Sequence, residues 1–462
     1  MTSNVRRLHT PVTQYYFTPY DYRVIIEKIR NEFARVSEKV IGRELIILQF
    51  ACALLTRNHL LLLGRTGIAK SMLANELFEI FKASGAKTFT IKASVEDTKD
   101  NYFGPIDIPR YRDEGVKIRR IKSSVLEADF AFIDELFDTN EQILRDLMLL
   151  LSDRMLFEGS ERYHARLHTC MAASNYLRLN EVTEAVVDRF AYRSVITAET
   201  DAFTQFRIDR SFISKGAAPS GPVQPISRDE IDYLSRIACG LEGDLNIEIS
   251  DDVLYLKNII LRYFIDRMKK AKGNYYISPR RQAGVINHLR ALAMLNGRTK
   301  VEENDLPRMG LMLCMVGAEG NEVETFTKTA EETIRYMHSD ETFRKQLVLL
   351  TTMLNVIEVL RANPKRAESI DLDVLGLVPP QKKWREELAE KIAHKDDFEV
   401  TVEKLRAVLA DIKPTNLYIQ ELAEGCHKQL QDLARISATG QEPSLWHRQR
   451  VSPARKPPNR HP

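Results

Sequence analysis

Residues 60–78, LLLLGRTGIAKSMLANELF, decide the fold of this chain. Four consecutive leucines open the stretch and predict a short strand that is buried on both faces. Apolar residues then recur at helical spacing from Met72 onward, so a helix follows the strand. The loop between them, GRTGIAKS, contains two glycines and closes with Lys70 and Ser71. Such a loop between a strand and a helix predicts a phosphate-binding site.

The chemistry of this loop follows from its place before a helix. The first turn of a helix presents unpaired backbone N–H groups to an anion. Lys70 can reach the β- and γ-phosphates of a nucleotide, and the Ser71 hydroxyl can bind Mg²⁺. The loop departs from the usual G-x-x-x-x-G-K-[ST] pattern because Ala69 replaces the second glycine. Taken alone, an ordinary glycine turn before a helix is an equally good interpretation.

An acidic pair downstream strengthens the nucleotide interpretation. Residues 129–135, DFAFIDE, predict a central strand with Asp134 and Glu135 at its carboxyl end, where open α/β sheets bind their ligands. Asp134 can hold Mg²⁺ through water, and Glu135 can orient or deprotonate an attacking water. A solvated acidic pair at the end of a strand is the alternative, and the preceding phosphate loop weakens it.

Two further segments carry candidate polar groups. Residues 167–175, LHTCMAASN, predict a strand that ends at Asn175, whose amide can lie between the γ-phosphate and Glu135. Residues 184–190, EAVVDRF, place Arg189 in an apolar helical context, which suits an arginine finger that reaches the γ-phosphate of a neighbouring subunit. The alternatives are an asparagine that opens a turn and an arginine paired with Asp188 or Glu184.

The order of these motifs resembles that of the AAA+ ATPases, and within them the MoxR branch, closest to its RavA-type members. The resemblance covers about residues 25–320. It rests on the segments VSEKVIGRE (36–44), GRTGIAKS (64–71), YFGPIDI (102–108), DEGVKIRR (113–120), ADFAFIDE (128–135), MAASN (171–175), EAVVDRF (184–190) and ISPRRQ (277–282). Ala69 is usual in that branch. Thr66 stands where its members commonly have proline, which changes the stiffness of the loop but not its donors.

The resemblance implies an α/β fold and a set of site residues. It implies an AAA+ core with a parallel sheet flanked by helices, an all-helical lid and, beyond it, a mostly helical C-terminal region. ATP or ADP and Mg²⁺ are the implied cofactors. The implied roles are Val40 and Ile41 beside the adenine; Gly64, Arg65, Thr66, Gly67, Ile68, Ala69, Lys70, Ser71 and Met72 around the phosphates (Walker A); Ser71 and Asp134 on Mg²⁺; Glu135 as catalytic base (Walker B); Asn175 as sensor 1; Arg189 as the finger acting in trans; and Arg280 as sensor 2. Arg281 is adjacent, and the sequence does not separate the two; an arginine that merely starts a helix after Ser-Pro is the alternative.

The resemblance also implies an activity and partners. Members of the branch hydrolyse ATP between the subunits of a ring, here expected to be a hexamer, and remodel or activate a partner protein in a chaperone-like way. MoxR proteins often act with a partner that carries a von Willebrand factor A (vWA) domain. The alternative is a scaffold whose assembly depends on the nucleotide and whose hydrolysis is incidental. The sequence does not name the client.

The chain divides by composition into five predicted parts. These are an N-terminal arm (1–20), the nucleotide-binding core (21–205), a helical lid (206–320), a helical C-terminal region (321–437) and a disordered basic tail (438–462). Residues 103–126 form an insertion in the core, and residues 152–166 predict a hairpin. Ser227 and Glu230 fit a capping box that opens a helix after the Gly- and Pro-rich stretch 212–228.

Composition limits the class of protein. A hydrophobic content of 44%, a charged content of 28% and a mean hydropathy of −0.29 describe a soluble globular chain with no membrane span. The N-terminus lacks the apolar segment of a secretory signal, and five scattered cysteines suit free thiols in a reducing cytoplasm. A net charge of +3 makes nucleic acid an unlikely partner.

Overall fold

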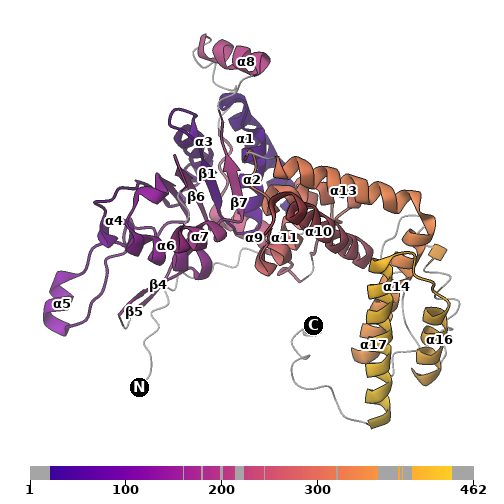
Figure 1. Ribbon diagram of the computed structural model, residues 1–462. Helices are drawn as coiled ribbons and strands as arrows, with labels where there is room; N and C mark the ends of the chain where they lie inside the picture. Colours follow the sequence, from indigo (N-terminus) through magenta and orange to yellow (C-terminus); the bar gives the residue numbers. More distant parts are fainter. Residues whose placement is uncertain are drawn as a thin grey trace, which may run out of the picture. The chain divides into compact units, whose positions relative to one another are not determined.

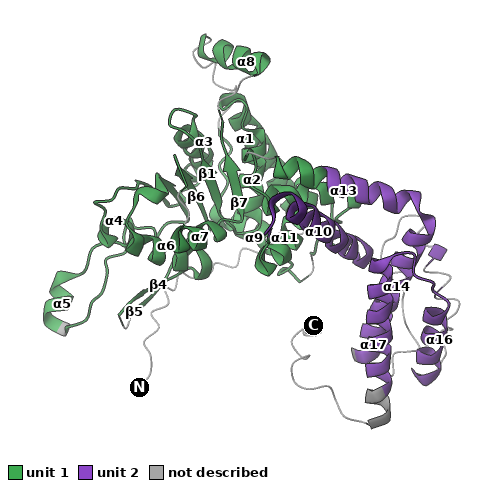
Figure 2. Cartoon of the chain, in the orientation of Figure 1, with its two compact units in different colours: residues 1–248, 276–327 green, residues 249–275, 328–462 purple. Residues whose placement is uncertain are grey.

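The computed structural model describes residues 21–159, 161–177, 180–197, 201–213, 223–243, 245–318, 321–362, 383–384, 388 and 398–439. The predicted arm (1–20) and residues 440–462 of the predicted tail lie outside the described residues. The chain forms two compact units (Figure 2). Unit 1 combines the residues up to 248 with residues 276–327, and unit 2 combines residues 249–275 with those from 328 onward.

A five-stranded parallel sheet forms the centre of unit 1 (Figure 1). Its strands are β1 (Leu60–Leu63), β2 (Thr88–Lys92), β3 (Phe130–Asp134), β6 (Thr169–Ser174) and β7 (Tyr192–Val195), in the order β2-β3-β6-β1-β7. Both β1 and β6 are buried along their whole length, as central parallel strands covered by helices must be. The predicted α/β fold with a parallel sheet is confirmed.

Because all five strands run in one direction, the two ends of the sheet differ. We call the side where the strands finish the carboxyl end and the side where they begin the amino end. The phosphate loop (residues 64–69) leaves β1 at the carboxyl end, and Asp134 and Glu135 lie at the carboxyl end of β3. The fold therefore gathers segments that are far apart in the sequence.

Helices cover the sheet and extend unit 1. They are α1 (Asp21–Lys39), α2 (Glu44–Leu55), α3 (Lys70–Lys82), α4 (Lys99–Phe103), α5 (Ile108–Glu114), α6 (Glu141–Asp153), α7 (Glu181–Asp188), α8 (Ala202–Ile213), α9 (Arg228–Ala238), α11 (Pro279–Leu295) and α12 (Gly310–Leu313), with 3₁₀ segments at Leu136–Asp138 and Glu303–Met309. The predicted capping box is present, since Ser227 accepts from the Glu230 N–H and Glu230 accepts from the Ser227 N–H. The predicted hairpin also forms, from β4 (Met155–Glu158) and β5 (Glu161–His164).

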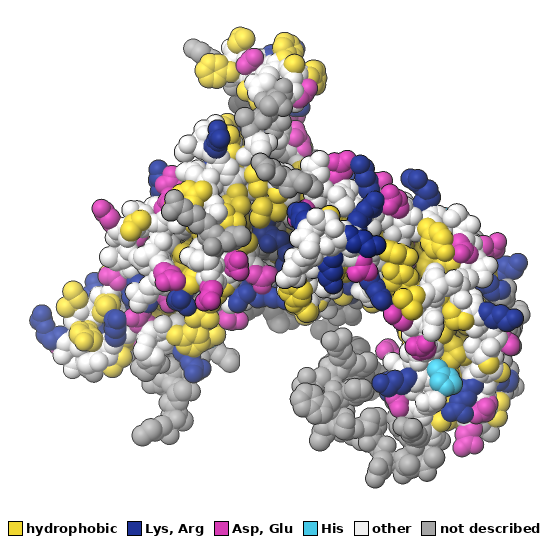
Figure 3. Space-filling view, in the orientation of Figure 1, with side chains coloured by type: hydrophobic (Ala, Val, Ile, Leu, Met, Phe, Trp, Pro, Cys, Tyr) yellow, Lys and Arg dark blue, Asp and Glu magenta, His cyan; other side chains and the backbone are white. Residues whose placement is uncertain are grey.

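The core of unit 1 lies between the sheet and its helices. The rings of Phe81 on α3 and Phe130 on β3 stack with centroids 4.4 Å apart. In contrast, α8 has no buried residue, and its large side chains Phe203, Phe206, Phe212 and Ile213 are exposed (Figure 3). No helix within the described ranges is long and apolar enough to cross a membrane.

Unit 2 is helical. It contains α10 (Asp251–Lys272), α14 (Glu341–Ala362), α16 (Phe398–Ala410) and α17 (Leu417–Thr439), and α13 (Glu322–Ser339) crosses the boundary between the units. An ion pair of 2.7 Å between Arg262 and Glu421 joins α10 to α17, and α14 packs along α17. The compact units thus divide the predicted lid, because α10 groups with the C-terminal helices. Likewise, α17 continues two residues past the predicted boundary at 437.

Candidate nucleotide-hydrolysis site

The phosphate loop has a backbone that only particular residues allow. A side chain at Gly64 would collide with the Ile196 carbonyl oxygen, so the strand-to-loop turn requires glycine. Ala69 adopts the left-handed conformation (φ 65°) immediately before α3, which costs a residue with a Cβ about 1 kcal/mol. Backbone strain of this kind concentrates at functional sites. The tip of the loop, Arg65 to Gly67, is exposed.

Lys70 begins α3 and is buried inside the loop. Its ammonium donates to the Gly64 carbonyl, to the Arg65 carbonyl at 3.0 Å and to Asn175 Oδ1 at 2.9 Å. Burial lowers the pKa of Lys70, and the charges of Asp134 and Glu135 partly offset that shift. A cation in the first turn of a helix, where backbone N–H groups are unpaired, is suited to polyphosphate.

Ser71 and Asp134 come together as the sequence predicts. The Ser71 hydroxyl donates to Asp134 Oδ2 at 2.9 Å, although the two residues lie on different elements. A hydroxyl and a carboxylate are the hard oxygen ligands that Mg²⁺ uses beside substrate phosphates. The pair therefore fits Mg²⁺ by the chemistry of its donors.

Glu135 is held between two polar partners. It sits in the left-handed conformation (φ 54°) directly after β3. Asn175 Nδ2 donates to Glu135 Oε1 at 3.3 Å while Asn175 Oδ1 accepts from Lys70, so the amide bridges the two predicted residues. Lys92 Nζ also lies 3.3 Å from Glu135 Oε1.

Lys92 is a site residue that sequence reasoning missed. It ends β2, TFTIK, and pairs in register with Asp134 of β3. Its signal in the sequence is only a charged residue at the end of a strand. The order of strands in the sheet, which brings β2 beside β3, is what makes it a neighbour of Glu135.

The predicted adenine residues follow α1. Val40 is buried and Ile41 is partly buried. An ion pair of 2.7 Å between Lys39 and Glu76 fastens the end of α1 to α3, the helix that starts at the phosphate loop. Met72, in the first turn of α3, is 48% exposed. The ion pair brings the chain just before Val40 and Ile41 to the helix of the phosphate loop, and their role beside the adenine stays a prediction.

The two predicted arginines lie elsewhere. Arg189 follows α7 and precedes β7, which places it at the amino end of the sheet. Its Nη1 lies 3.5 Å from Asp188 Oδ2, so the local ion pair that the sequence left open is present, with long geometry.

The structure also separates Arg280 from Arg281. Arg281 is buried and donates to the carbonyls of Met312 (2.7 Å) and Leu313 (2.5 Å), whereas Arg280 is exposed.

Arg280 also belongs to the amino end. Burial lowers the pKa of His59, which directly precedes β1, and the charges of Arg154, Arg280 and Arg57 lower it further. The charge of Arg280 acts on Arg154 as well, which associates Arg280 with the residues of the amino end. The four residues of β1 span about 13 Å, so Arg189 and Arg280 are separated from the phosphate loop by the length of a strand. The structure does not bring them to Lys70 and Glu135 of the same chain.

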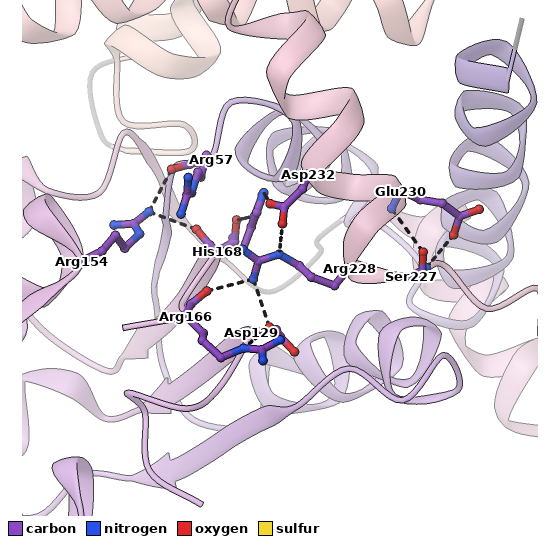
Figure 4. A network of polar contacts seen from close by, with 10 residues as sticks. Arg57, Asp129, Arg154, Arg166, His168, Ser227, Arg228, Glu230 and Asp232 are labelled. Atoms are coloured by element: carbon purple, nitrogen blue, oxygen red, sulfur yellow. Dashed lines mark hydrogen bonds and ion pairs between the residues drawn. The ribbon is translucent and has the colours of Figure 1, made fainter. Parts of the chain in front are cut away.

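A network of ion pairs and hydrogen bonds occupies the amino end (Figure 4). Asp129 accepts from Arg166 at 3.0 Å and from Arg228 at 3.3 Å, which joins β3 to α9. Arg154 Nη2 donates to the carbonyls of His168 and Arg57, both at 3.0 Å. Arginines outnumber the carboxylates in this network.

Comparison with known proteins agrees with the geometry of the carboxyl end. Residues 27–210 match the family model of the MoxR domain in the MoxR-vWA-β-propeller ternary systems, and residues 248–326 match the model of an AAA lid domain. The chain contains a MoxR-type AAA+ ATPase module. The polar residues at the carboxyl end of the sheet (Lys70, Ser71, Lys92, Asp134, Glu135 and Asn175) all fall within the MoxR match. Arg280 falls within the lid match.

Two relatives of this chain are uncharacterised proteins, and a solved structure that it resembles shows the fold alone. The chain is 27% identical over 282 residues to the uncharacterised protein MJ0079 of Methanocaldococcus jannaschii, covering 61% of this chain and 68% of that protein. It is 24% identical over 409 residues to the uncharacterised protein MJ0812 of the same organism, covering 87% of this chain and all of that protein. A crystal structure of a candidate ATPase from Cytophaga hutchinsonii superposes with a TM-score of 0.52 and 18% identity, covering 68% of this chain and 95% of the other.

Proposed function

We propose that this MoxR-type protein hydrolyses ATP in a Mg²⁺-dependent reaction between the subunits of a ring, expected to be a hexamer, and uses the reaction to remodel or activate a partner protein. The single observation that supports it best is the contact set at the carboxyl end. Lys70, Asn175 and Glu135 form one hydrogen-bonded chain, and the Ser71–Asp134 pair lies beside it.

Each residue of that set has a role in the proposal. Lys70 and the N–H groups of the loop bind the phosphates. Ser71 and Asp134 hold Mg²⁺, which neutralises charge on the phosphate oxygens when bound. Asn175 orients the attacking water, and Glu135 takes its proton. Lys92 and Asn175 fix the carboxylate of Glu135, which limits the directions in which it can accept that proton.

Arg189 and Arg280 act in trans in this proposal. Both lie at the amino end of the sheet, a strand length from their own phosphate loop. An arginine that stabilises charge in the transition state must contact the transferred phosphate. A second copy that places its amino end against the carboxyl end of the first supplies that contact.

The partner and the location are further parts of the proposal. The matched MoxR model is named for systems that include vWA proteins, which supports a vWA-domain partner. We also propose a RavA-type subgroup and a cytoplasmic location, on the sequence motifs and on five free cysteines.

Mixing two inactive variants tests the proposal. Arg189→Ala subunits should bind ATP normally and lose hydrolysis, and Lys70→Ala subunits should lack nucleotide. In mixed assemblies, an intact Lys70 pocket can receive Arg189 from its Lys70→Ala neighbour, so part of the activity should return. The measurement is phosphate release against the ratio of the two variants.

The same experiment has outcomes that contradict the proposal. Full activity of Arg189→Ala alone would leave the Asp188 ion pair as the role of that arginine. No recovery in assemblies shown to be mixed would exclude the trans arrangement. Normal assembly with ATP but no turnover in the unaltered protein would favour the nucleotide-dependent scaffold.

A further inference from the structure

Two helices of unit 1 end at the amino end with an arginine in the left-handed conformation. Arg57 follows α2 (φ 53°) and Arg154 follows α6 (φ 57°). This position is usually glycine, because a residue with a Cβ is strained in the left-handed conformation. The backbone at Arg57 makes both hydrogen bonds of a glycine-type helix end, from Asn58 N–H to the Ala53 carbonyl (2.8 Å) and from Arg57 N–H to the Leu54 carbonyl (3.2 Å). Each arginine therefore carries its side chain at a conformational cost.

The side chain of Arg154 has a role within the subunit. It donates to the Leu151 carbonyl of its own helix. It also donates to the carbonyls of His168 and Arg57, and these two bonds are each 3.0 Å long (Figure 4). These bonds cap the C-terminus of α6 and fix the backbone of the turn that contains Arg57. Burial lowers the pKa of Arg154 to about 9, and the charge of Arg57 adds to that shift. Arg154 is thus a positioning residue for Arg57.

The side chain of Arg57 has no such role. It is exposed, and within the part of the chain that the structure describes its guanidinium makes no hydrogen bond or ion pair. A cation at a helix C-terminus is modestly favourable, which is a purely structural explanation. That gain only balances the cost of the left-handed conformation, and it ignores repulsion from the neighbouring arginines.

The charges of three arginines, Arg154, Arg280 and Arg57, act on one buried histidine at this place. Charges on Arg57 and Arg280 both act on His59. The ring of His59 also meets the ring of Phe190 edge-on, with centroids 6.0 Å apart, and Phe190 is next to Arg189. Clustered cations repel one another, and an anion brought from outside relieves that repulsion.

We propose that Arg57 is a third cation for the phosphates of the nucleotide held by a neighbouring copy, acting beside Arg189 and Arg280. The inference rests on the proposed function, because it needs the amino end of one copy to face the carboxyl end of the next. The Arg57 guanidinium could bind either a phosphate or a carboxylate of the neighbouring copy, since both are anions. We assign it to the phosphates because they carry the higher charge density.

Arg57→Gly is the sharpest variant for the test. Glycine suits the left-handed conformation, so the turn should be at least as stable as before. Turnover of the assembled protein should fall about 10-fold or more, as for other groups that stabilise transition-state charge. ATP binding by isolated subunits should not change. Arg57→Lys keeps the charge and should retain more activity than Arg57→Gly.

Two controls keep the result specific. Arg30→Ala removes an exposed arginine of α1 that has no assigned role in the site, and should leave turnover unchanged. Mixing Arg57→Gly with Lys70→Ala subunits should restore part of the activity, as expected for a residue that acts in trans. Assembly is measured in the Glu135→Gln background, where ATP stays bound, and again with ADP.

The outcomes separate this inference from the proposed function. Unchanged turnover of Arg57→Gly, with Arg189→Ala inactive, overturns the role of Arg57 and leaves the proposed function standing. Weakened ATP binding by isolated Arg57→Gly subunits, or no recovery on mixing, also overturns it. Assembly that weakens equally with ATP and ADP assigns Arg57 to a carboxylate of the neighbour and overturns the phosphate contact. Assembly that weakens only with ATP supports it.

Discussion

The carboxyl and amino ends of the sheet are built from opposite kinds of polar contact. At the carboxyl end, cations and carboxylates satisfy one another within the chain, as Lys70, Asn175, Glu135 and Lys92 do. At the amino end, arginines exceed their carboxylate partners, and Arg57 and Arg280 are exposed. If Arg189 and Arg280 serve the phosphates as proposed, they must do so in a neighbouring copy, because a strand length separates them from their own phosphate loop. The difference is the physical basis for the assembly proposed above.

The comparison predicts its largest effect at Lys70. Lys70→Ala should abolish nucleotide binding by the isolated subunit, because it removes the cation buried in the phosphate loop. Titration with a fluorescent ATP analogue measures this. Arg30→Ala, at an exposed position, should bind like the original. An affinity near that of the original in Lys70→Ala would show that the carboxyl end is not the site.

Next in size is the effect of the catalytic base. Glu135→Gln should keep ATP bound and slow turnover by ~10²-fold or more, because the amide preserves shape but cannot accept a proton. Steady-state phosphate release and ATP binding, measured on the same preparation, separate the two effects. A normal rate of hydrolysis by Glu135→Gln would mean that another residue is the base. The carboxyl end of the sheet would then no longer differ from the amino end by carrying the catalytic group.

Acidification should weaken the amino end through its buried histidines. His288 Nε2 donates to the Arg308 carbonyl (3.0 Å), and its Nδ1 lies 3.1 Å from the Tyr192 hydroxyl, from which the neutral ring accepts a hydrogen bond. Burial lowers its pKa to about 4, below the value near 6.5 of the unfolded chain. The stability that it contributes is therefore fully present above pH ~6.5 and is lost as the pH falls toward 4, by up to about 3 kcal/mol.

His288→Gln provides the comparison for this effect. Glutamine can still accept and donate but does not titrate. In urea unfolding followed by circular dichroism from pH 7.5 to 4.5, the original protein should lose more stability than the variant. Parallel pH profiles of the two proteins would contradict the assignment of His288.

The smallest predicted effect concerns the loop itself. Ala69→Gly removes the side chain from a left-handed residue and should change stability by about 1 kcal/mol or less, with ATP affinity essentially unaltered. Thermal melting and ATP titration measure both. A marked loss of affinity would mean that the Ala69 methyl group has a role in holding the loop.

Much of the site was predictable because its signals are local. A buried strand, a glycine loop and a helix in succession fix the place of Lys70 and Ser71, and the acidic pair at a strand end fixes Asp134 and Glu135. The capping box at Ser227 is equally local, and the structure contains it. These features depend on neighbours within a few residues, so one sequence suffices to find them.

Other residues were not predictable because their partners are distant in the sequence. Lys92 reaches Glu135 only because β2 lies beside β3. Arg280 and Arg281 are adjacent in the chain, and only the packing of α11 against α12 buries one of them and exposes the other. Arg57 carries no motif, and its left-handed conformation is visible only in the folded backbone.

The sequence by itself determined the class of the module and the strand, loop and helix that carry the predicted phosphate-binding residues, since hydrophobic period and turn chemistry set these elements. The tertiary structure decided which groups share an end of the sheet. Parallel strands align by direction, so residues far apart in the chain meet at the carboxyl end, and Arg57, Arg189 and Arg280 gather at the amino end. No local pattern encodes that separation, because it arises from strand order and from the way α11 packs.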